Sequence, residues 1–502
     1  MTHPTDEIVS AMLAPTAKNR LRIQEAYDFA EKAHGEEKRK SGEPYIIHPR
    51  SIAVTLAKLG MDTDTIVAGI LHDTLEDTSV TAEEIGKKFG DTVRFLVESV
   101  TKLSKLKYRG LERHVESLRR LLVATANDIR VIIIKLADRL HNMQTIEFVT
   151  PHEKQVRIAK DTMEVHVPVA ERLGIGSIKA DLEDLAFAVL DPEGYKTAAT
   201  IMTEARERKE KSLEEAVKDL KRSLAEGGIR KFRTETRVKN IYSFAKKLEE
   251  KEGNIDRVYD LFAVRIIVPT IEDCYRALGI VHKKWRPVIG RVKDYIATAK
   301  PNGYQSLHSS VITGSGVALE VQIRTEEMHR EAQYGVASHF GYKAKDAAAT
   351  QSYLQWITSF LPVIMKTPKP AKKHETPRWL RDLTAIDAEH LERNALHEAL
   401  KEDFFAERMF IYTPKGDVID LPVGATPVDF AYEVHTDLVE NMAGAKVNGK
   451  MVQINSLLHN GNVVEILTKK TAKPSKKWEE YAKTARAKRH IRGLLKKAEE
   501  NT

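Results

Sequence analysis

The stretch IVAGILHDTLEDT, residues 66–78, joins an apolar run to a dense group of ionisable side chains. The residues from Ile66 to Leu71 are apolar or glycine, which is typical of a helix face that packs in a core. An imidazole and three carboxylates follow at once: His72, Asp73, Glu76 and Asp77. Because ionisable groups are costly to bury without partners, this arrangement predicts a functional cleft next to the core of a helical domain.

Helical spacing would bring these four side chains together. Residues four apart on an α-helix lie on nearly the same side. His72 has this spacing with Glu76, and Asp73 has it with Asp77. All four could therefore point into one cleft.

Two further segments offer partners for this cleft. The segment KLADRLHNM, residues 135–143, places Asp138 and Asn142 four residues apart, while its leucines serve the core. His48 lies in PYIIHP, residues 44–49, where the following proline interrupts a simple helix.

Two imidazoles and two carboxylates form a mixed nitrogen and oxygen site for a divalent ion such as manganese, iron or zinc. An ion with open positions lowers the pKa of water and polarises phosphoryl oxygens. Glu76 and Asp77 would then be free to orient or deprotonate the attacking water. Taken singly, His48 is more often a capped or core histidine and Asp138 is usually a surface acid; the joint pattern indicates the metal site.

Positive charge is concentrated in two zones of the 502-residue chain, whose net charge is +8. Residues 230–310 contain 17 Lys/Arg against nine Asp/Glu, and residues 469–500 contain 12 against four. Such zones favour phosphate-rich partners. The second zone is equally typical of a solvated basic helix that has no partner.

The first basic zone and the segment LEVQIRT shortly after it hold the parts of a second, nucleotide-binding site. A nucleotide polyphosphate needs cations for its phosphates, a carboxylate for magnesium and a base near the attacking hydroxyl. The candidate cations are Arg237, Lys239, Lys246, Lys247, Lys293 and Lys300. Tyr304 offers an aromatic face, with His308 four residues after it. Asp260 and Glu320 are the candidate carboxylates. No GxxxxGK[ST] loop occurs, so this is not a P-loop site. Separately, each residue also suits a solvated face, a turn or ordinary packing.

Patterning predicts a multidomain protein. Helical periodicity predicts an all-α domain over residues 1–195, and β-rich segments such as LFAVRIIV predict an α+β domain over 196–345. A linker is expected over 346–402, a small domain of short strands over 403–468 and a basic helical tail over 469–502.

One cysteine, Cys274, excludes an intramolecular disulfide and a cysteine-cluster zinc module. No apolar run is long enough for a membrane helix and the N-terminus lacks a signal-peptide core. We therefore expect a soluble, cytoplasmic protein with no membrane partner.

The segments RKSGEPYIIHP (39–49), LHDTLEDT and KLADRLHNM resemble the motifs of an HD-type phosphohydrolase, and more narrowly the hydrolase domain of the RelA/SpoT homologue family. That family makes and destroys the alarmones ppGpp and pppGpp. The resemblance implies removal of the 3′-pyrophosphate to give GDP or GTP. It implies that Glu76 and Asp77 serve the water, that Arg39 packs on guanine and that Asn142 contacts the nucleoside. The implied ligands of a metal ion, typically Mn²⁺, are His48, His72, Asp73 and Asp138.

The segments RVKNIYSFAKKL (237–248), YDLFAVRIIV (259–268), GRVKDYIATAKPNGYQSLHSSV (290–311) and EVQIRTEEMHREAQYGVASHF (320–340) are similar to the synthetase domain of the same family, which has a nucleotidyltransferase-like fold. This resemblance implies transfer of the β,γ-pyrophosphoryl group of ATP to the 3′-hydroxyl of GDP or GTP. It implies that Asp260 binds Mg²⁺ and that Glu320 assists the hydroxyl. ATP would be held by Arg237, Lys239 and Lys247. The acceptor side would be formed by Lys300, Asn302, Tyr304, which stacks on guanine, and His308, with Lys293 in the RVKD form associated with bifunctional members.

Residues 409–452 resemble a TGS domain, a β-grasp module that in this family senses uncharged tRNA, with His435 at the contact. A purely structural or intramolecular regulatory role is the alternative for this module, and the basic tail after it could hold RNA phosphates. Longer members continue to an ACT domain. We expect this chain to lack that region, because it ends at Thr502.

Together these patterns predict a bifunctional GTP/GDP pyrophosphokinase and guanosine-3′,5′-bis(diphosphate) 3′-pyrophosphohydrolase of the stringent response. One alternative is a hydrolase with a weak or decayed synthetase. The other is a regulator that binds tRNA or the ribosome and whose catalytic halves are relics.

Overall fold

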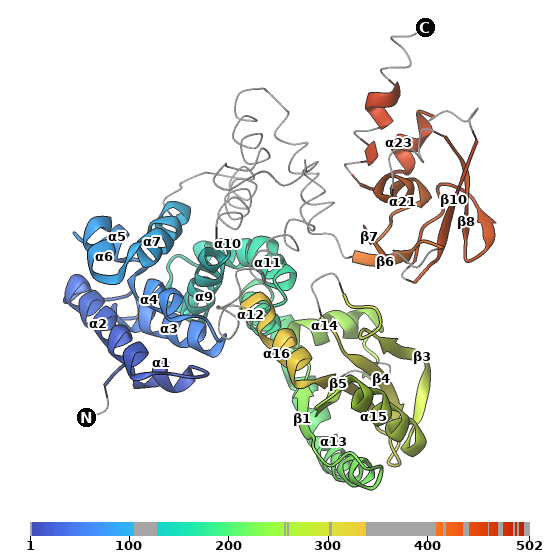
Figure 1. Cartoon of the computed structure of the whole chain (residues 1–502), viewed down its shortest axis with the longest axis horizontal. Coiled ribbons are helices and arrows are strands. Elements are labelled where there is room, and N and C mark those ends of the chain that lie inside the picture. The colour runs from blue at the N-terminus through green and yellow to red at the C-terminus, as the bar shows by residue number, and fades with distance from the viewer. Residues whose placement is uncertain are drawn as a thin grey trace. The chain divides into compact units, whose positions relative to one another are not determined.

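The computed structural model describes residues 3–104, 128–255, 258, 261–300, 304–337, 408–414, 418–434, 441–459, 461–469, 475–484, 487–488 and 491–495. These residues form two compact units, one ending at residue 337 and the other beginning at residue 408 (Figure 1). The expected linker over 346–402 lies outside the described residues, as do Asp260, Asn302 and His435.

The N-terminal half of the first unit is built of helices in its described residues, apart from an isolated β-bridge between Lys38 and Pro44, as the periodicity predicts. Its elements are α1 (Asp6–Ala11), α2 (Ala17–His34), α3 (Ile47–Lys58), α4 (Thr63–Leu71), α5 (Thr74–Asp77), α6 (Ala82–Phe89), α7 (Asp91–Ser104), α9 (Arg130–Gln144), the 3₁₀ turn η1 (Ile146–Phe148), α10 (His152–Asp161), the π turn η2 (Thr162–His166), α11 (Val167–Arg172) and α12 (Gly176–Leu190).

Helix α4 lies at the centre of this half. The Asp62 side chain caps its first turn by accepting from the backbone of Thr65 at 2.7 Å. Every residue from Thr65 to Leu71 is buried, and α2, α3, α7 and α9 pack around the helix. At Gly69 an added Cβ would lie 2.4 Å from Leu56 Cδ1, so glycine permits the close approach of α3 to α4. The opening apolar run is therefore a core helix.

Helix α13 (Pro192–Glu226) leads into the second half of this unit. Asp191 caps its start by accepting from the backbone of Gly194, and Pro192 occupies the first turn, where a missing N–H costs nothing. The helix ends at Gly227, and Gly228 follows with φ of +82°, as the glycine pair predicts.

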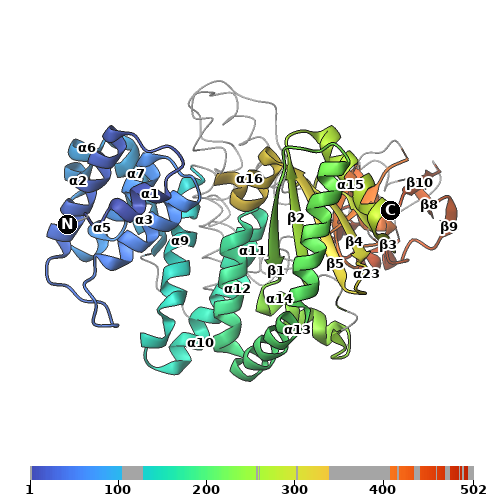
Figure 2. The ribbon, with the colours of Figure 1, turned by 90° about the horizontal axis from the view of Figure 1, so that it is seen from below.

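The second half is a mixed five-stranded sheet with flanking helices. The strands are β1 (Arg233–Val238), β2 (Phe262–Val268), β3 (Arg286–Asp294), β4 (Leu307–Ile312) and β5 (Ala318–Thr325), and the helices are α14 (Ile241–Glu250), α15 (Ile271–Lys284) and α16 (Glu326–Tyr334), followed by the 3₁₀ turn η4 (Gly335–Ala337). The strand order is β1-β2-β5-β4-β3 (Figure 2), with only β2 and β5 parallel.

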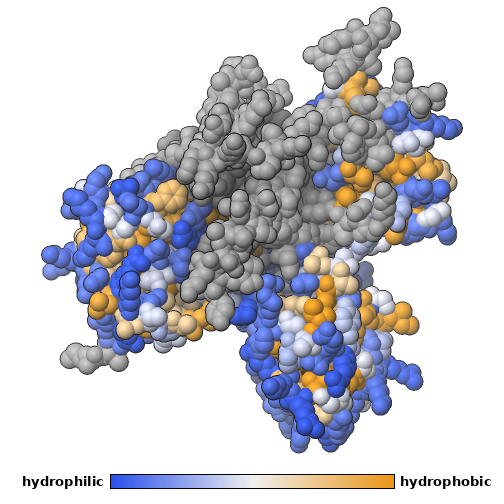
Figure 3. All heavy atoms as spheres, viewed as in Figure 1, coloured by the Kyte–Doolittle hydropathy of each residue, from blue (hydrophilic) through white to orange (hydrophobic). Residues whose placement is uncertain are grey.

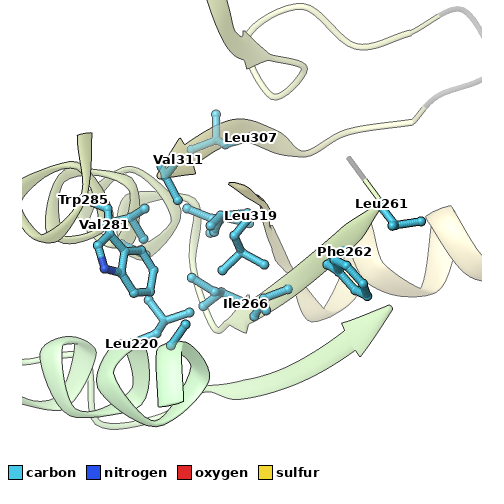
Figure 4. Packing of buried hydrophobic residues seen from close by; sticks show 14 of the residues in the cluster. Leu220, Leu261, Phe262, Ile266, Val281, Trp285, Leu307, Val311 and Leu319 are labelled. Carbon is cyan, nitrogen blue, oxygen red and sulfur yellow. The ribbon is translucent and has the colours of Figure 1, made fainter. Parts of the chain in front are cut away.

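Alternation along β2 and β5 divides this sheet into two unlike faces. Val264, Ile266, Val321 and Ile323 point to one face and bury completely under α13 and α15. Figure 4 shows Leu220 of α13 and Trp285 at the end of α15 packed against this apolar face. Side chains on the opposite face come from the intervening residues and are largely polar, which leaves that face available for a site.

The second unit contains the hairpin β6 (Arg408–Tyr412) and β7 (Val418–Pro422), the sheet of β8 (Met442–Val447), β9 (Lys450–Val452) and β10 (Val464–Thr468), and the helices α21 (Pro427–Val434) and α23 (Lys477–Tyr481). Short strands therefore occur where they were expected.

Residues of the basic tail pack into the core of this unit. Trp478, Ala487 and Ile491 cluster with residues of α21 and β8. The buried Asp429 of α21 accepts hydrogen bonds from the backbone N–H groups of Lys483 and Thr484, at 2.8–3.0 Å. The division between small domain and tail at residue 468 stays a prediction.

On the face shown in Figure 3, the described residues are mainly hydrophilic, with separate hydrophobic patches. Among the exposed apolar side chains, Ile289 on the edge strand β3 is 99% accessible. No helix within the described residues combines the length and the apolar character needed to cross a membrane.

Two isoleucines of the five-stranded sheet test its two-faced construction. Replacing the fully buried Ile266 by alanine removes three methyl or methylene groups from the core, and we expect it to lower the free energy of unfolding by about 2–5 kcal/mol. The matched change Ile289→Ala, on the exposed edge, should alter it by no more than about 0.5 kcal/mol. Denaturant titrations of both variants measure the difference, and equal midpoints would contradict the assignment of the core face.

Candidate active sites

The first candidate site lies where α4 ends. The helix stops at Leu71, His72 follows it as a turn residue, and the short helix α5 begins at Thr74. The expectation that His72 to Asp77 lie on one continuous helix is therefore wrong. On the two sides of this break, the His72 ring is buried, whereas Glu76 and Asp77 are exposed beside the cluster.

The structure brings His48, His72 and Asp138 together with ligand atoms that all lie within 4.8 Å of one another. Asp73 joins them, since its Oδ2 lies 3.1 Å from His72 Nε2 and 3.6 Å from His48 Nε2. The three clustered residues are at most 5% exposed and come from α3, the end of α4 and α9. The predicted set of four thus converges from three separate segments.

The donor chemistry of this cluster fits a divalent ion. His72 Nδ1 lies 2.9 Å from the Gly69 carbonyl, which can only accept, so Nδ1 carries a proton and Nε2 is the nitrogen left to bind a metal ion. That Nε2 is buried 3.1 Å from Asp73 Oδ2; burial lowers the pKa of the ring, but the carboxylates of Asp73 and Asp138 raise it above its usual value. Burial alone would raise the pKa of Asp138, but Lys135 at 2.6 Å and the two imidazoles hold it well below its usual range. An ionised carboxylate and an unprotonated imidazole nitrogen are the forms that bind metals.

Arg39 and Asn142 lie together beside this cluster. Arg39 Nη2 donates to Asn142 Oδ1 at 2.9 Å, and Asn142 Nδ2 donates to Asp138 Oδ1 at 2.5 Å. The two residues predicted to contact the nucleoside are therefore connected to each other and to a predicted metal ligand.

Two neighbours of the cluster were missed by the sequence analysis. The Tyr45 hydroxyl lies 2.7 Å from Asp73 Oδ2 and 3.0 Å from Asp77 Oδ2, while its ring stacks on His34 at 4.4 Å. It is the contact that holds Asp77 next to the cluster. The second neighbour is the buried His141, whose pKa burial lowers to about 4. Both belong to segments that carry the predicted ligands, but no spacing rule reveals which side chain turns inward.

The second candidate site occupies the polar face of the five-stranded sheet. Strand register places one residue from each strand in a row, because cross-strand partners share a face. That row consists of Glu235, Arg265, Gln322, His308 and Lys293. The next row contains Arg237, Ala263, Glu320 and Ser310. Four predicted residues, Arg237, Lys293, His308 and Glu320, therefore lie on one face although they are up to 83 positions apart.

A chain of hydrogen bonds connects the predicted acceptor-side residues. His308 Nδ1 donates to Glu320 Oε1 at 2.9 Å, and His308 Nε2 accepts from the Tyr304 hydroxyl at 2.8 Å. Arg324, which is 1% exposed, donates to the same hydroxyl oxygen at 3.0 Å. Burial lowers the pKa of His308, which favours the neutral ring that this chain requires. The arrangement orients Glu320 and holds the Tyr304 ring in place.

Cations surround this chain. Lys300 Nζ lies 4.9 Å from the centre of the Tyr295 ring and 5.2 Å from that of Tyr304, and burial lowers its pKa. Lys239 follows β1 and Lys247 lies on α14. Arg265 and Arg324 are additional guanidinium groups that the sequence analysis missed, although alternation along LFAVRIIV and EVQIRT would have placed them on this face. Clustered cations on a half-buried surface suit an anionic ligand.

Helix α12 supplies carboxylates to the start of α14. Asp184 accepts from the backbone N–H of Tyr242 at 2.8 Å and of Ile241 at 3.2 Å, and Asn240 donates to Glu183 at 3.0 Å. The segment that carries Arg237, Lys239 and Lys247 is thus attached at its middle to a helix of the N-terminal half.

Three family models match this chain. The model described as "HD domain" matches residues 26–176, "Region found in RelA / SpoT proteins" matches residues 236–347 and "TGS domain" matches residues 409–468. The first two ranges contain the metal cluster and the polar sheet face.

Curated relatives match almost the whole chain. The guanosine-3′,5′-bis(diphosphate) 3′-pyrophosphohydrolase of Aquifex aeolicus is 44% identical over 98% of this chain and 67% of its own length. A GTP pyrophosphokinase of Myxococcus xanthus is 42% identical over 94% of this chain and 60% of its own length. The bifunctional (p)ppGpp synthase/hydrolase SpoT of Escherichia coli is 39% identical over 95% and 65%, respectively. The chain therefore spans about two thirds of the length of these relatives.

Substitutions of two acids test the metal cluster: Asp138 lies within α9 and belongs to the cluster, whereas Asp128 precedes α9 and lies outside the cluster. Asp138→Asn removes an anionic ligand, and we expect it to weaken Mn²⁺ binding by more than about 100-fold, since loss of even an outer-shell partner costs about 10–100-fold. Asp128→Asn, which weakens contacts with the side chain and backbone of Arg130 outside the cluster, should leave the affinity unchanged. The signal of free Mn²⁺ in electron paramagnetic resonance titrations gives both affinities. Tight binding by Asp138→Asn would refute the cluster as the metal site.

Proposed function

The chain belongs to the RelA/SpoT family, and from this membership we propose that it both synthesises and hydrolyses the alarmones ppGpp and pppGpp. In synthesis it would transfer the β,γ-pyrophosphoryl group of ATP to the 3′-hydroxyl of GDP or GTP. In hydrolysis it would release the 3′-pyrophosphate and return GDP or GTP. The observation that carries the proposal is the presence in one unit of a buried His48–His72–Asp138 cluster and a separate sheet face bearing the His308–Glu320 pair.

For hydrolysis, we propose His48, His72, Asp73 and Asp138 as the ligands of Mn²⁺. A divalent ion held there supplies polarisation of the phosphoryl group and a lower pKa for water. Glu76 and Asp77, exposed beside the cluster, would orient the attacking water and take its proton. The Tyr45 hydroxyl limits where the Asp77 carboxylate can move. Arg39 would lie on the guanine and Asn142 would hold the nucleoside, both within reach of Asp138 through the observed hydrogen bonds.

For synthesis, Glu320 would accept the proton of the attacking 3′-hydroxyl, oriented for that task by His308. Tyr304 would stack on guanine, with Lys300, Lys293 and Asn302 on the acceptor side. Arg237, Lys239 and Lys247 would neutralise the phosphates of ATP, and Asp260 would hold Mg²⁺. Positioning and charge neutralisation are the main contributions that phosphoryl transfer needs from a protein, which is what a rigid polar sheet face provides.

For the second unit, we propose binding of uncharged tRNA, and through it of the ribosome, with His435 at the contact. The tail supports this proposal because its packing against α21 presents Lys483, Lys488 and Arg492 from a folded module. Cations held in fixed positions can contact RNA phosphates without reading sequence.

Labelled nucleotides separate the bifunctional proposal from its alternatives. One reaction would contain ATP, GDP and Mg²⁺, and the other ppGpp and Mn²⁺; we expect product in both. His72→Ala should abolish hydrolysis and spare synthesis, whereas Glu320→Ala should do the reverse, because the two residues lie in separate clusters. Thin-layer chromatography measures both products. Hydrolysis without synthesis would favour a hydrolase with a decayed synthetase. The absence of product in both reactions, together with binding of deacylated tRNA, would favour a regulator.

Two substitutions of Tyr304 test the guanine-stacking role. Tyr304→Ala removes the aromatic face, and base stacking of about 1–3 kcal/mol predicts a 5- to 150-fold rise in the KM for GDP, on the order of the affinity lost. Tyr304→Phe keeps the face and loses only the hydroxyl that bonds His308 and Arg324, so we expect a much smaller rise. The KM for ATP serves as the internal control. Equal effects of both substitutions on GDP would contradict stacking.

A further inference from the structure

His141 occupies a position between the metal cluster and the residue proposed to hold guanine. It lies on α9, three residues after Asp138, and is buried. Its Nδ1 is 2.7 Å from Arg39 Nη1 and 2.9 Å from His48 Nδ1. Arg39 Nη1 is also 3.0 Å from His48 Nδ1, so the three nitrogens form a triangle.

The hydrogens in this triangle follow from the chemistry of its members. A guanidinium carries only donors, so the shortest contact requires His141 Nδ1 to be the acceptor, with its proton on Nε2. A favourable contact between the two imidazoles then requires His48 Nδ1 to carry a proton. With Nδ1 protonated, the neutral His48 ring has its lone pair on Nε2. That atom is 3.4 Å from Asp138 Oδ1 and 3.6 Å from Asp73 Oδ2, inside the cluster.

We infer that His141 is a positioning residue, a neutral acceptor that keeps His48 in the tautomer needed for binding a metal ion and is itself held by Arg39. The inference rests on the proposed hydrolase function and deepens it. Ligand histidines almost always donate their second ring N–H to an acceptor. His72 uses the Gly69 carbonyl for this purpose, and His48 uses the His141 ring.

Each assignment leaves one contact of the triangle between two donors. With His141 Nδ1 as the acceptor it is the longest contact, from Arg39 Nη1 to His48 Nδ1 at 3.0 Å. If His48 Nδ1 were the acceptor and His141 Nδ1 carried the proton, it would be the shortest, between Arg39 and His141 at 2.7 Å, so the opposite assignment fits the geometry less well. His48 Nε2 would then carry a proton and could not bind a metal ion.

A neutral ring at position 141 also preserves the charge of Arg39. A carboxylate there could accept from His48 equally well, but it would form an ion pair with the guanidinium and compete with the nucleotide for it. An imidazole accepts from both groups through Nδ1 alone and leaves the charge of Arg39 intact. The same side chain therefore connects the guanine contact to the metal ligand.

Two amide substitutions distinguish which nitrogen of His141 is used. The Oδ1 of asparagine lies near the place of Nδ1, whereas the polar end of glutamine reaches the place of Nε2. We expect His141→Asn to retain Mn²⁺ affinity within about threefold and His141→Gln to lose about 10–100-fold. The measurement is a Mn²⁺ titration without nucleotide, in the Asp260→Ala background so that the synthetase site does not contribute. Exposed His152, on α10, supplies the control His152→Asn, which should match the parent.

Turnover provides the second readout. For His141→Gln, the rate of ppGpp hydrolysis should recover as the Mn²⁺ concentration is raised, because the defect is in ligand orientation. The folding control is pyrophosphoryl transfer by the same variant with Asp260 intact. Equal affinities for the asparagine and glutamine variants, or wild-type affinity in both, would overturn the inference. If the parent protein does not hydrolyse ppGpp, the proposed hydrolase function is refuted, whatever the ranking of the variants in Mn²⁺ affinity.

Discussion

Both sites depend on the cost of burying an ionisable group. An unpaired charge in the interior loses several kcal/mol of hydration, so every such group needs a compensating partner. In the N-terminal half, His48, His72 and Asp138 meet this requirement only as a set, with Lys135, Asn142 and the Gly69 carbonyl around them. His72 Nε2 lies 3.1 Å from Asp73 Oδ2, among ligand atoms of His48 and Asp138 that a divalent cation could bind together.

The five-stranded sheet also compensates its buried ionisable groups, but through a different geometry. Period-two alternation sends the apolar residues of β2 and β5 to the core and leaves Glu320, Gln322 and Arg324 on the other face. There the buried Arg324 is satisfied in part by Tyr304 and Gln322, and His308 by Glu320. A sheet can hold such a row rigidly because each strand is fixed by its neighbours. Helices instead bring their few polar residues together at a point where one of them ends.

The connection between the halves is also polar. Asp184 of α12 satisfies backbone donors at the start of α14 that an isolated helix would leave to water. The segment proposed to hold ATP is therefore attached to the helical half through hydrogen bonds, in addition to the covalent link through α13. In the second unit, Asp429 does the same for the chain after α23 by accepting from consecutive backbone N–H groups. In both places a carboxylate accepts from backbone N–H groups of a segment more than 50 positions away in the sequence.

The sequence alone predicted the helical half, the mixed half and the short strands of the second unit, together with most of the residues that converge in the two clusters. Helical periodicity, strand alternation and the glycine pair after α13 are local properties, and local propensity agrees with the fold in each case. The motif residues around His72, Asp138, Tyr304 and Glu320 were recognisable for the same reason. Only the tertiary structure decided that α4 ends before His72, that Tyr45 turns toward Asp73 and Asp77, and that Arg324 lies beneath Tyr304. It also decided the contact between His141 and His48, which are 93 positions apart. Such contacts depend on how separate segments pack, and packing between distant segments leaves no periodic signal in either of them.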